Sequence, residues 1–301
     1  METIRLFNQE LIVKDELCST DPNDSKKCHA TLRLYIKLTD NCNAHCLFCA
    51  NGNSCDYGNL DLNKLEYVIR YLISEDRLQG ISITGGEPLL EYNKLFQLLD
   101  LIYTIDPNLE IQISTNGINL LKLLNYPEIN KLESIHISRH HYDDDINNHI
   151  FKSDRVAQAK DIISLQEHLE DKKIININTL VMKDYISNST EIKNMLDHVG
   201  ELGVYKNGFV SLMKCNSYTE EQFINFNDIF SHLDSSFYKG HHFYHREYCE
   251  CLDGIYLTKY NKLVEYYARM LKNCNCPYTT QLVYTSDNRL TAGFGKKLIY
   301  K

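Results

Sequence analysis

Short apolar segments alternate with segments of helical period between residues 31 and 215 of this chain. Brief runs of Leu, Ile and Val between polar residues are typical of buried strands, whereas apolar residues three and four positions apart predict one face of a helix. Asp61 is expected to cap a helix in which Leu65, Val68, Ile69 and Leu72 follow the helical spacing. Further helices are predicted at 92–103, near 120, at 154–168 and after Thr190. The six predicted strands span 32–38, 80–84, 110–114, 134–138, 174–181 and 209–213.

A chain whose strands and helices alternate forms a parallel sheet, and such a sheet carries its functional loops at the carboxyl ends of the strands. We therefore predict an α/β domain over 31–215. Residues 216–301 lose the alternation and are predicted to form a separate C-terminal module that ends in a hairpin turning at Asp287 and Asn288. Residues 1–30, which include the polar and turn-rich segment 18–28, are predicted as an N-terminal extension.

The charge balance narrows the possible partners. The 32 basic and 40 acidic residues give a net charge of −8, which argues against broad binding to nucleic acid. No apolar run reaches the roughly 18 residues that a membrane-spanning helix needs, and the N-terminus lacks the layout of a signal peptide. We therefore expect a cytoplasmic protein without a nucleic-acid or membrane partner. Since the cytosol keeps thiols reduced, the 11 cysteines are expected to include metal or redox ligands.

A group of three cysteines directly follows the first predicted strand. Cys42, Cys46 and Cys49 have the spacing C-x3-C-x2-C. Iron–sulfur clusters are normally held by four cysteine thiolates, so three thiolates on one loop leave one iron of a cubane open to a ligand. The same spacing can also occur by chance or within a zinc site. Two motifs at the ends of later predicted strands, Gly85-Gly86-Glu87 and Ser114-Thr115-Asn116-Gly117, favour the cluster.

With these motifs the chain resembles the radical S-adenosylmethionine (radical SAM) superfamily. The resemblance implies a partial (β/α)6 TIM-like barrel and a [4Fe-4S] cluster whose open iron binds S-adenosylmethionine. In that superfamily, an electron from the reduced cluster cleaves S-adenosylmethionine to a 5'-deoxyadenosyl radical, which abstracts a hydrogen atom from a substrate carbon. The resemblance also implies a flavodoxin- or ferredoxin-type reductant as a partner.

The family resemblance assigns cofactor contacts to other residues. Gly85, Gly86 and Glu87 match the motif that binds the amino group of the methionine moiety, and Phe48 matches an aromatic residue that contacts adenine. Each has an ordinary alternative, a glycine turn in the first case and a packing aromatic in the second. The remaining contacts implied for ribose or the methionine moiety, all at strand ends or within a strand, are Ser114, Asn116, Ser138, Arg139 and Asn178.

The predicted C-terminal module contains a second set of cysteines. Two C-x-C pairs can close a complete four-thiolate site, either for a second [4Fe-4S] cluster or for a structural zinc ion. Many radical SAM relatives carry an auxiliary cluster in such a module, called twitch or SPASM, although the spacing here matches neither pattern cleanly. The four cysteines are Cys249, Cys251, Cys274 and Cys276.

Cys215, at the end of the sixth predicted strand, is the candidate catalytic residue. Its thiol would donate a hydrogen atom to a substrate radical, as a cysteine does in radical SAM epimerases. It can also be an auxiliary ligand or a buried structural thiol, because free cysteine packs like a small apolar residue. His140 and His141 are expected either to contact substrate or to lie at a solvated helix entrance.

These residues lead to one preferred function and two alternatives. The preferred function is a radical SAM enzyme that modifies a peptide by epimerisation, oxidation or cross-linking. The first alternative is a radical SAM enzyme acting on a small metabolite such as a sugar, aminoglycoside or nucleotide. The second is a noncatalytic iron–sulfur electron carrier, whose cluster spectrum would not respond to S-adenosylmethionine.

Overall fold

The chain forms two compact units in a computed structural model. The first unit contains 1–41, 54–113 and 276–301, and the second contains 42–53 and 114–275. The residues that the structure describes are 2–13, 16–17, 27–28, 31–49, 58–172, 174–225, 228–229, 238–245, 252–258, 263–267, 279, 281–294 and 297–301. No helix in these ranges is long and apolar enough to cross a membrane.

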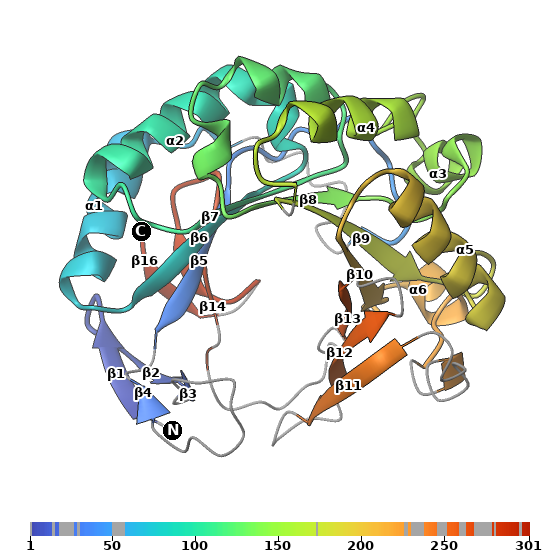
Figure 1. Cartoon of the computed structure of the whole chain (residues 1–301). Helices are drawn as coiled ribbons and strands as arrows, with labels where there is room; N and C mark the ends of the chain where they lie inside the picture. Colours follow the sequence, from blue (N-terminus) through green and yellow to red (C-terminus); the bar gives the residue numbers. More distant parts are fainter. Residues whose placement is uncertain are drawn as a thin grey trace. The chain divides into compact units, whose positions relative to one another are not determined.

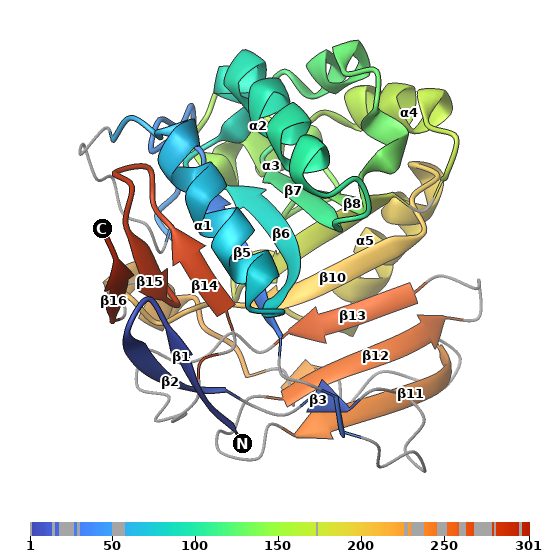
Figure 2. The same cartoon turned by 90° about the vertical axis from the view of Figure 1, so that its left-hand side faces the viewer.

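Parallel strands form the centre of the first unit. β6 pairs in parallel with β5 and with β7, whose last two residues belong to the second unit. On the other edge of β5, β14 pairs in parallel, and β15 and β16 continue the sheet antiparallel (Figure 2). β1 and β2 form an antiparallel ribbon, as do the two short strands β3 and β4. The bounds are β1 Glu2–Leu6, β2 Gln9–Val13, β3 Glu16–Leu17, β4 Lys27–Cys28, β5 Leu32–Lys37, β6 Leu78–Thr84, β7 Ile111–Thr115, β14 Gln281–Tyr284, β15 Leu290–Ala292 and β16 Leu298–Tyr300.

The helices of the first unit, α1 (Leu62–Ser74) and α2 (Tyr92–Ile105), lie on one face of β5 and β6 (Figure 1). A short 3-10 helix, η1 (Pro88–Glu91), leads into α2. Asp61 accepts hydrogen bonds from the backbone N–H groups of Asn63 and Lys64, which confirms the predicted cap of α1. The predicted face of α1 is fully buried: Leu65, Val68, Ile69 and Leu72.

The strands of the second unit are also mostly parallel. β8, β9, β10 and β13 are parallel, and β12 and β11 follow antiparallel (Figure 2). The strand bounds are β8 Ser134–Ser138, β9 Ile175–Val181, β10 Lys206–Ser211, β11 Tyr238–His245, β12 Leu252–Thr258 and β13 Leu263–Tyr267. The helix bounds are η2 Leu120–Asn125, η3 Ile129–Lys131, α3 Asp144–Phe151, α4 Ala159–His168, α5 Ser189–Glu201 and α6 Ser217–Glu221.

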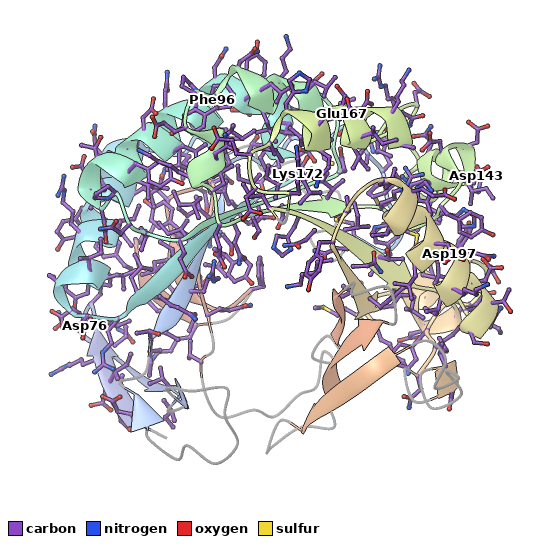
Figure 3. All side chains as sticks on the ribbon, viewed as in Figure 1. Asp76, Phe96, Asp143, Glu167, Lys172 and Asp197 are labelled. Carbon is purple, nitrogen blue, oxygen red and sulfur yellow. The ribbon has the colours of Figure 1, made fainter. Side chains whose placement is uncertain are left out.

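Lys172 closes the C-terminal end of α4 (Figure 3). Its Nζ donates to the backbone carbonyl oxygens of Gln166 at 2.7 Å, Glu167 at 3.1 Å and Leu169 at 2.6 Å. Carbonyl groups at the end of a helix lack intrahelical partners, so an ammonium group there satisfies them and interacts favourably with the helix dipole. This contact fixes the connection from α4 into β9.

The α/β fold class and the order of strands β5 to β10 confirm the predicted partial TIM-like barrel fold. Several boundaries differ. α4 begins at Ala159 rather than at residue 154, and Asn188 rather than Thr190 caps α5. β10 ends at Ser211, before the predicted end at residue 213.

Strands beyond residue 215 pair with parallel strands in both units. β13 pairs in parallel with β10, and β14 pairs in parallel with β5. Part of the segment predicted as a separate module therefore pairs with the parallel strands of the two units. The predicted division at residues 30 and 215 stays a prediction, and it rests on the loss of the repeating pattern, which carries no information about long-range strand pairing.

Candidate active site

The three predicted cluster ligands lie on one loop of the second unit. The Cys42 thiol is exposed, and the thiols of Cys46 and Cys49 are half-buried. The backbone N–H of His45 donates to the carbonyl of Phe151 at 3.0 Å, and the Cys46 thiol contacts the same carbonyl with a Sγ···O distance of 3.6 Å. The N–H of Cys49 donates to the Cys46 carbonyl at 3.3 Å. The loop is therefore held against the last residue of α3.

Two asparagine side chains fix the first half of the cysteine loop. Nδ2 of Asn43 donates to Ser153 Oγ and to the Arg155 carbonyl, both at 3.1 Å. Nδ2 of the buried Asn116 donates to Asn43 Oδ1 at 2.8 Å and lies 3.9 Å from Cys42 Sγ. A nearby N–H donor favours the thiolate form of a cysteine. The predicted contact of Asn116 with S-adenosylmethionine stays a prediction; its observed contact is with the loop.

The electrostatics of the loop fit a positively charged centre. Burial, and then the neighbouring Cys49 and Cys42, raise the pKa of the Cys46 thiol to about 12. The three cysteines therefore cannot all be thiolates near neutral pH unless a cationic group binds them, and a metal centre deprotonates its cysteine ligands. In the described part of the chain, no three His, Cys, Asp or Glu side chains converge on a single metal ion. A cubane differs from a single ion because each cysteine binds a different iron.

Phe48, the predicted adenine contact, packs into the protein beside the cysteines. Its ring meets His140 edge-on at 5.1 Å and Phe151 at 6.1 Å between centroids. His140 and Phe151 stack at 4.7 Å with 13° between their planes. The buried apolar residues against which Phe48 packs come mainly from β9, β10 and α3: Ile150, Leu180, Met182, Val210 and Leu212. Phe48 is thus fixed by packing, and its contact with adenine stays a prediction.

Both predicted substrate histidines are buried and hydrogen-bonded to the protein. The backbone N–H of His140 donates to Asn147 Oδ1 at 2.8 Å, and its Nδ1 accepts from the N–H of Leu180 at 3.2 Å. Nδ1 of His141 accepts from the N–H of Asp143 at 3.0 Å, and burial lowers the pKa of His141. Asp143 in turn caps α3 (Figure 3). These contacts fix the turn between β8 and α3.

Arg139 is fully buried and paired within the protein. Its guanidinium forms an ion pair with Asp144 at 2.7 Å. It also donates to the carbonyl of Ala157 at 3.1 Å and to that of Tyr142 at 2.9 Å. Burial lowers the pKa of Arg139, and the hydrogen bond to Asp144 opposes this change. The observed contacts give Arg139 a structural function, while its pairing with a bound carboxylate stays a prediction.

Ser138 and Asn178 are direct neighbours in the parallel register of β8 and β9. Nδ2 of Asn178 lies 3.2 Å from His136 Nδ1. His136 Nε2 in turn lies 2.9 Å from Ser134 Oγ and 3.4 Å from Asn176 Nδ2. These residues form a polar row on one face of the two strands. His136 was missed in the sequence because its alternation with Ile residues was interpreted only as a strand pattern.

In the first unit, the two glycines of the predicted motif allow close backbone contact. The N–H of Gly86 donates to the Thr39 carbonyl and that of Glu87 to the Asn41 carbonyl, both at 2.7 Å. A Cβ on Gly85 would lie 2.4 Å from the Thr39 carbonyl oxygen, and one on Gly86 would lie 2.2 Å from that of Asn41. Residues with a side chain cannot approach so closely, so both positions require glycine.

Two glutamates hold this turn. Glu87 is 1% exposed, and its carboxylate accepts from the N–H of Leu89 at 2.9 Å, capping η1. Glu91 Oε1 accepts from Thr39 Oγ1 at 2.7 Å and from Asn41 Nδ2 at 3.2 Å. Glu91 thereby fixes the residue that precedes Cys42 in the sequence. No sequence signal identified it, since a glutamate before a helix is common.

Cys215 lies beyond the end of β10, in the turn before α6. Its thiol is half-buried. Its N–H donates to Thr219 Oγ1 at 2.9 Å, and that hydroxyl lies 3.8 Å from Cys215 Sγ. The catalytic function of Cys215 stays a prediction. The predicted auxiliary ligands lie outside the described residues: Cys249, Cys251, Cys274 and Cys276.

The α/β fold and the anchored cysteine loop define a protein of the kind that binds an iron–sulfur cluster at the ends of parallel strands. The family model of the radical SAM superfamily matches residues 36–197. Because this match covers more than half of the chain, the chain belongs to the radical SAM superfamily of enzymes. That family implies a [4Fe-4S] cluster and S-adenosylmethionine as cofactors.

The sequence relatives include GTP 3',8-cyclases. Those of Clostridium perfringens (strain SM101 / Type A) and Lactiplantibacillus plantarum are each 28% identical to this chain, over 172 and 166 residues. The alignments cover 54% of this chain and 50% and 49% of the relatives. The chain thus spans about half the length of the curated relatives it matches.

Solved structures with the same fold include SuiB of Streptococcus suis. SuiB bound to S-adenosylmethionine has a TM-score of 0.60 at 17% identity, and the alignment covers 89% of this chain and 63% of that chain. SuiB bound to its precursor peptide SuiA has a TM-score of 0.51 at 22% identity, covering 65% of this chain and 43% of that chain. At these identities the likeness shows the fold.

Proposed function

We propose that this chain binds a [4Fe-4S] cluster through Cys42, Cys46 and Cys49 and abstracts a hydrogen atom from a carbon of a peptide substrate. The observation that carries the proposal is the cysteine loop, in which burial and the neighbouring Cys49 and Cys42 oppose a Cys46 thiolate that a cluster would stabilise. A flavodoxin- or ferredoxin-type protein is the proposed reductant.

The residues around the loop position its ligands. When bound, the cluster and S-adenosylmethionine supply the radical chemistry. Asn43 and Asn116 fix the first half of the loop, and the amide hydrogens of Asn116 approach Cys42. Cys46 packs against the buried apolar residues Ala44, Phe151 and Val156, which keep water from one side of it. The chain thus orients the thiolates and lowers the polarity around them, both of which influence cluster potential.

The cluster proposal is tested by anaerobic reconstitution with iron and sulfide. Iron per chain is counted in the wild type and in a Cys42/Cys46/Cys49→Ala triple variant, and 5'-deoxyadenosine is measured after dithionite reduction. About eight irons in the wild type and about four in the variant would support one catalytic and one auxiliary cubane. A wild type that binds no iron at the loop, or whose spectrum does not respond to S-adenosylmethionine, would contradict the proposal.

The fold likeness to SuiB supports a peptide substrate, since it extends over 89% of this chain. SuiB has been crystallised with a precursor peptide. The GTP 3',8-cyclase relatives support a second candidate, a purine nucleotide, but over 54% of the chain. The two candidates are separated by adding GTP or a mixture of synthetic peptides to the reduced enzyme. Only the true substrate class should raise 5'-deoxyadenosine formation above the substrate-free rate.

We further propose that Cys215 returns a hydrogen atom to the substrate radical, which would make the overall reaction an epimerisation. The S–H bond breaks, a C–H bond forms, and the resulting sulfur radical needs one electron and one proton to restore the thiol. A second [4Fe-4S] cluster on the four C-terminal cysteines is the proposed electron donor. In D2O, the product should contain one solvent deuterium with the wild type and none with Cys215→Ala. Deuterium incorporation by the variant would remove Cys215 from this step.

A further inference from the structure

The second half of the cysteine loop is tied to α6 by one side chain. Nδ2 of Asn216 donates to the backbone carbonyl of Leu47 at 2.9 Å, and Leu47 lies between Cys46 and Cys49. The two hydrogen-bonded residues are 169 positions apart in the chain. The loop and α6 both belong to the second unit. The contact therefore links two cluster ligands to an element that is distant in sequence.

Asn216 is itself rigidly held. Its Oδ1 accepts from the N–H of Thr219 at 2.9 Å, so the residue caps α6, and its own N–H donates to Thr219 Oγ1 at 3.0 Å. Thr219 is fully buried. A side chain whose oxygen and nitrogen are both bonded has a fixed amide orientation, because rotating the amide by 180° would replace both contacts with repulsive ones. The Nδ2 donor is consequently aimed at the loop.

Apolar packing supports the same connection. Phe48, the residue after Leu47, and Phe223, which follows α6, both pack against one buried apolar cluster that includes Leu212. The Lys214 ammonium lies 4.0 Å above the Phe223 ring. Segment 212–223 thus meets the second half of the loop through one hydrogen bond and through this shared apolar cluster. The first half is held separately, by Asn43 and by the carbonyl of Phe151.

We propose that Asn216 is a positioning residue that fixes the Cys46–Cys49 segment of the loop and thereby slows the loss of the bound cluster. It acts through the Leu47 carbonyl rather than on a cysteine sulfur. Because Cys215 is the preceding residue and its N–H is bonded to the same Thr219 hydroxyl, the tether also fixes Cys215 relative to the loop. The effect of Asn216 on the position of the loop does not depend on a cluster. Its effect on the rate of cluster loss rests on the proposed function.

The test uses substitutions that keep the helix cap and remove the tether. Serine caps a helix about as well as asparagine, but it is too short to reach the Leu47 carbonyl, so Asn216→Ser isolates the tether. Asn188→Ser is the matched control. Asn188 caps α5 through Oδ1, at 3.0 Å from the N–H of Thr190 and 3.1 Å from that of Glu191. Asn216→Asp keeps the cap and places an acceptor beside the Leu47 carbonyl.

The first measurement is amide hydrogen exchange of residues 42–49 in the full-length, metal-free chain. Loss of one hydrogen bond should accelerate exchange in Asn216→Ser about fivefold, and more in Asn216→Asp, while Asn188→Ser should match the wild type. Equal exchange in Asn216→Ser and the wild type would overturn the tether. The loss of protection outside 42–49 and 212–223 would show general unfolding instead and would also count against it.

The second measurement is the anaerobic release of iron from the reconstituted full-length chain to a chelator, with no S-adenosylmethionine or substrate added. Release should be about fivefold faster in Asn216→Ser than in the wild type and unchanged in Asn188→Ser. Equal release rates, with faster exchange in the metal-free chain, would overturn the protective function while leaving the tether in place. A wild type that binds no iron at the loop would refute the proposed function and not the tether.

Discussion

The stability of this protein should fall unusually steeply below neutral pH because of His198, in the last turn of α5. Its side chain is 14% exposed, and its Nε2 is buried without a hydrogen-bond partner among the described residues. Burial, and then the Arg139 guanidinium, lower the pKa of His198 to about 4, although Asp144 opposes this change. Glu201 lies 3.9 Å away but is largely exposed, so its attraction is weak.

The direction and size of this pH effect on the free energy of unfolding follow from proton linkage. Between pH 6.5 and 4 the unfolded chain binds a proton at His198 and the folded chain does not, so acid favours unfolding. With pKa values of about 6.5 unfolded and about 4 folded, the free energy of unfolding falls by about 2 kcal/mol between pH 7.5 and pH 5. This stability is fully present above pH 7 and is lost as the pH falls towards 4.

The assay is anaerobic urea unfolding at both pH values for the wild type and for His198→Gln, which cannot titrate. Carboxylates change the unfolding free energy with pH equally in both proteins. The difference between the two pH dependences therefore comes from His198 alone. The free energy of unfolding of the wild type should fall by about 2 kcal/mol more than that of the variant between pH 7.5 and pH 5. His168→Gln, at an exposed histidine in the last turn of α4, serves as the control for the substitution. Parallel pH profiles for the wild type and His198→Gln would refute the reasoning.

Substitutions at three further positions test the local contacts that hold the fold. Gly86→Ala should destabilise the first unit by at least about 2 kcal/mol in urea unfolding, because its Cβ would lie 2.2 Å from the Asn41 carbonyl oxygen; a smaller cost would show that the turn can shift. Asp61→Ala should cost about 1 kcal/mol by loss of the α1 cap, whereas Asp61→Asn should be near neutral. Asp144→Asn should cost about 2 kcal/mol in thermal unfolding, since it leaves the buried Arg139 cation without its carboxylate; an unchanged midpoint would show that the ion pair contributes nothing.

Local patterns predicted the parts of the molecule that depend on neighbouring residues. The α1 cap at Asp61 and its buried face were correct because both are set within a few residues of one another. The cysteine loop was located for the same reason, since its spacing is contained in one short segment. The cap of α5 shows the limit: Asn188 and Thr190 are both favourable capping residues, and only the backbone geometry decides between them.

Long-range contacts were not predictable from these patterns. The pairing of β14 with β5 joins residues that are far apart in the chain, and a hairpin motif says nothing about which strand it will meet. The ion pair of Arg139 was missed for a related reason. Its partner Asp144 lies in the following helix, and a strand pattern does not show which side chain an arginine at the end of the strand will meet.

Three side chains that hold the cysteine loop share one chemistry, the neutral carboxamide. Asn43, Asn116 and Asn216 each use both ends of the amide: the oxygen accepts from Asn116 Nδ2, the Ile118 N–H and the Thr219 N–H, respectively, while the nitrogen donates to another segment. An amide can therefore bridge two segments of chain with a short side chain that loses little entropy on ordering. A lysine or arginine in these positions would stabilise the thiolates by its charge and would compete with a bound cation. Neutral tethers fix the positions of the cysteines and leave the charge at the loop to be balanced by what binds there.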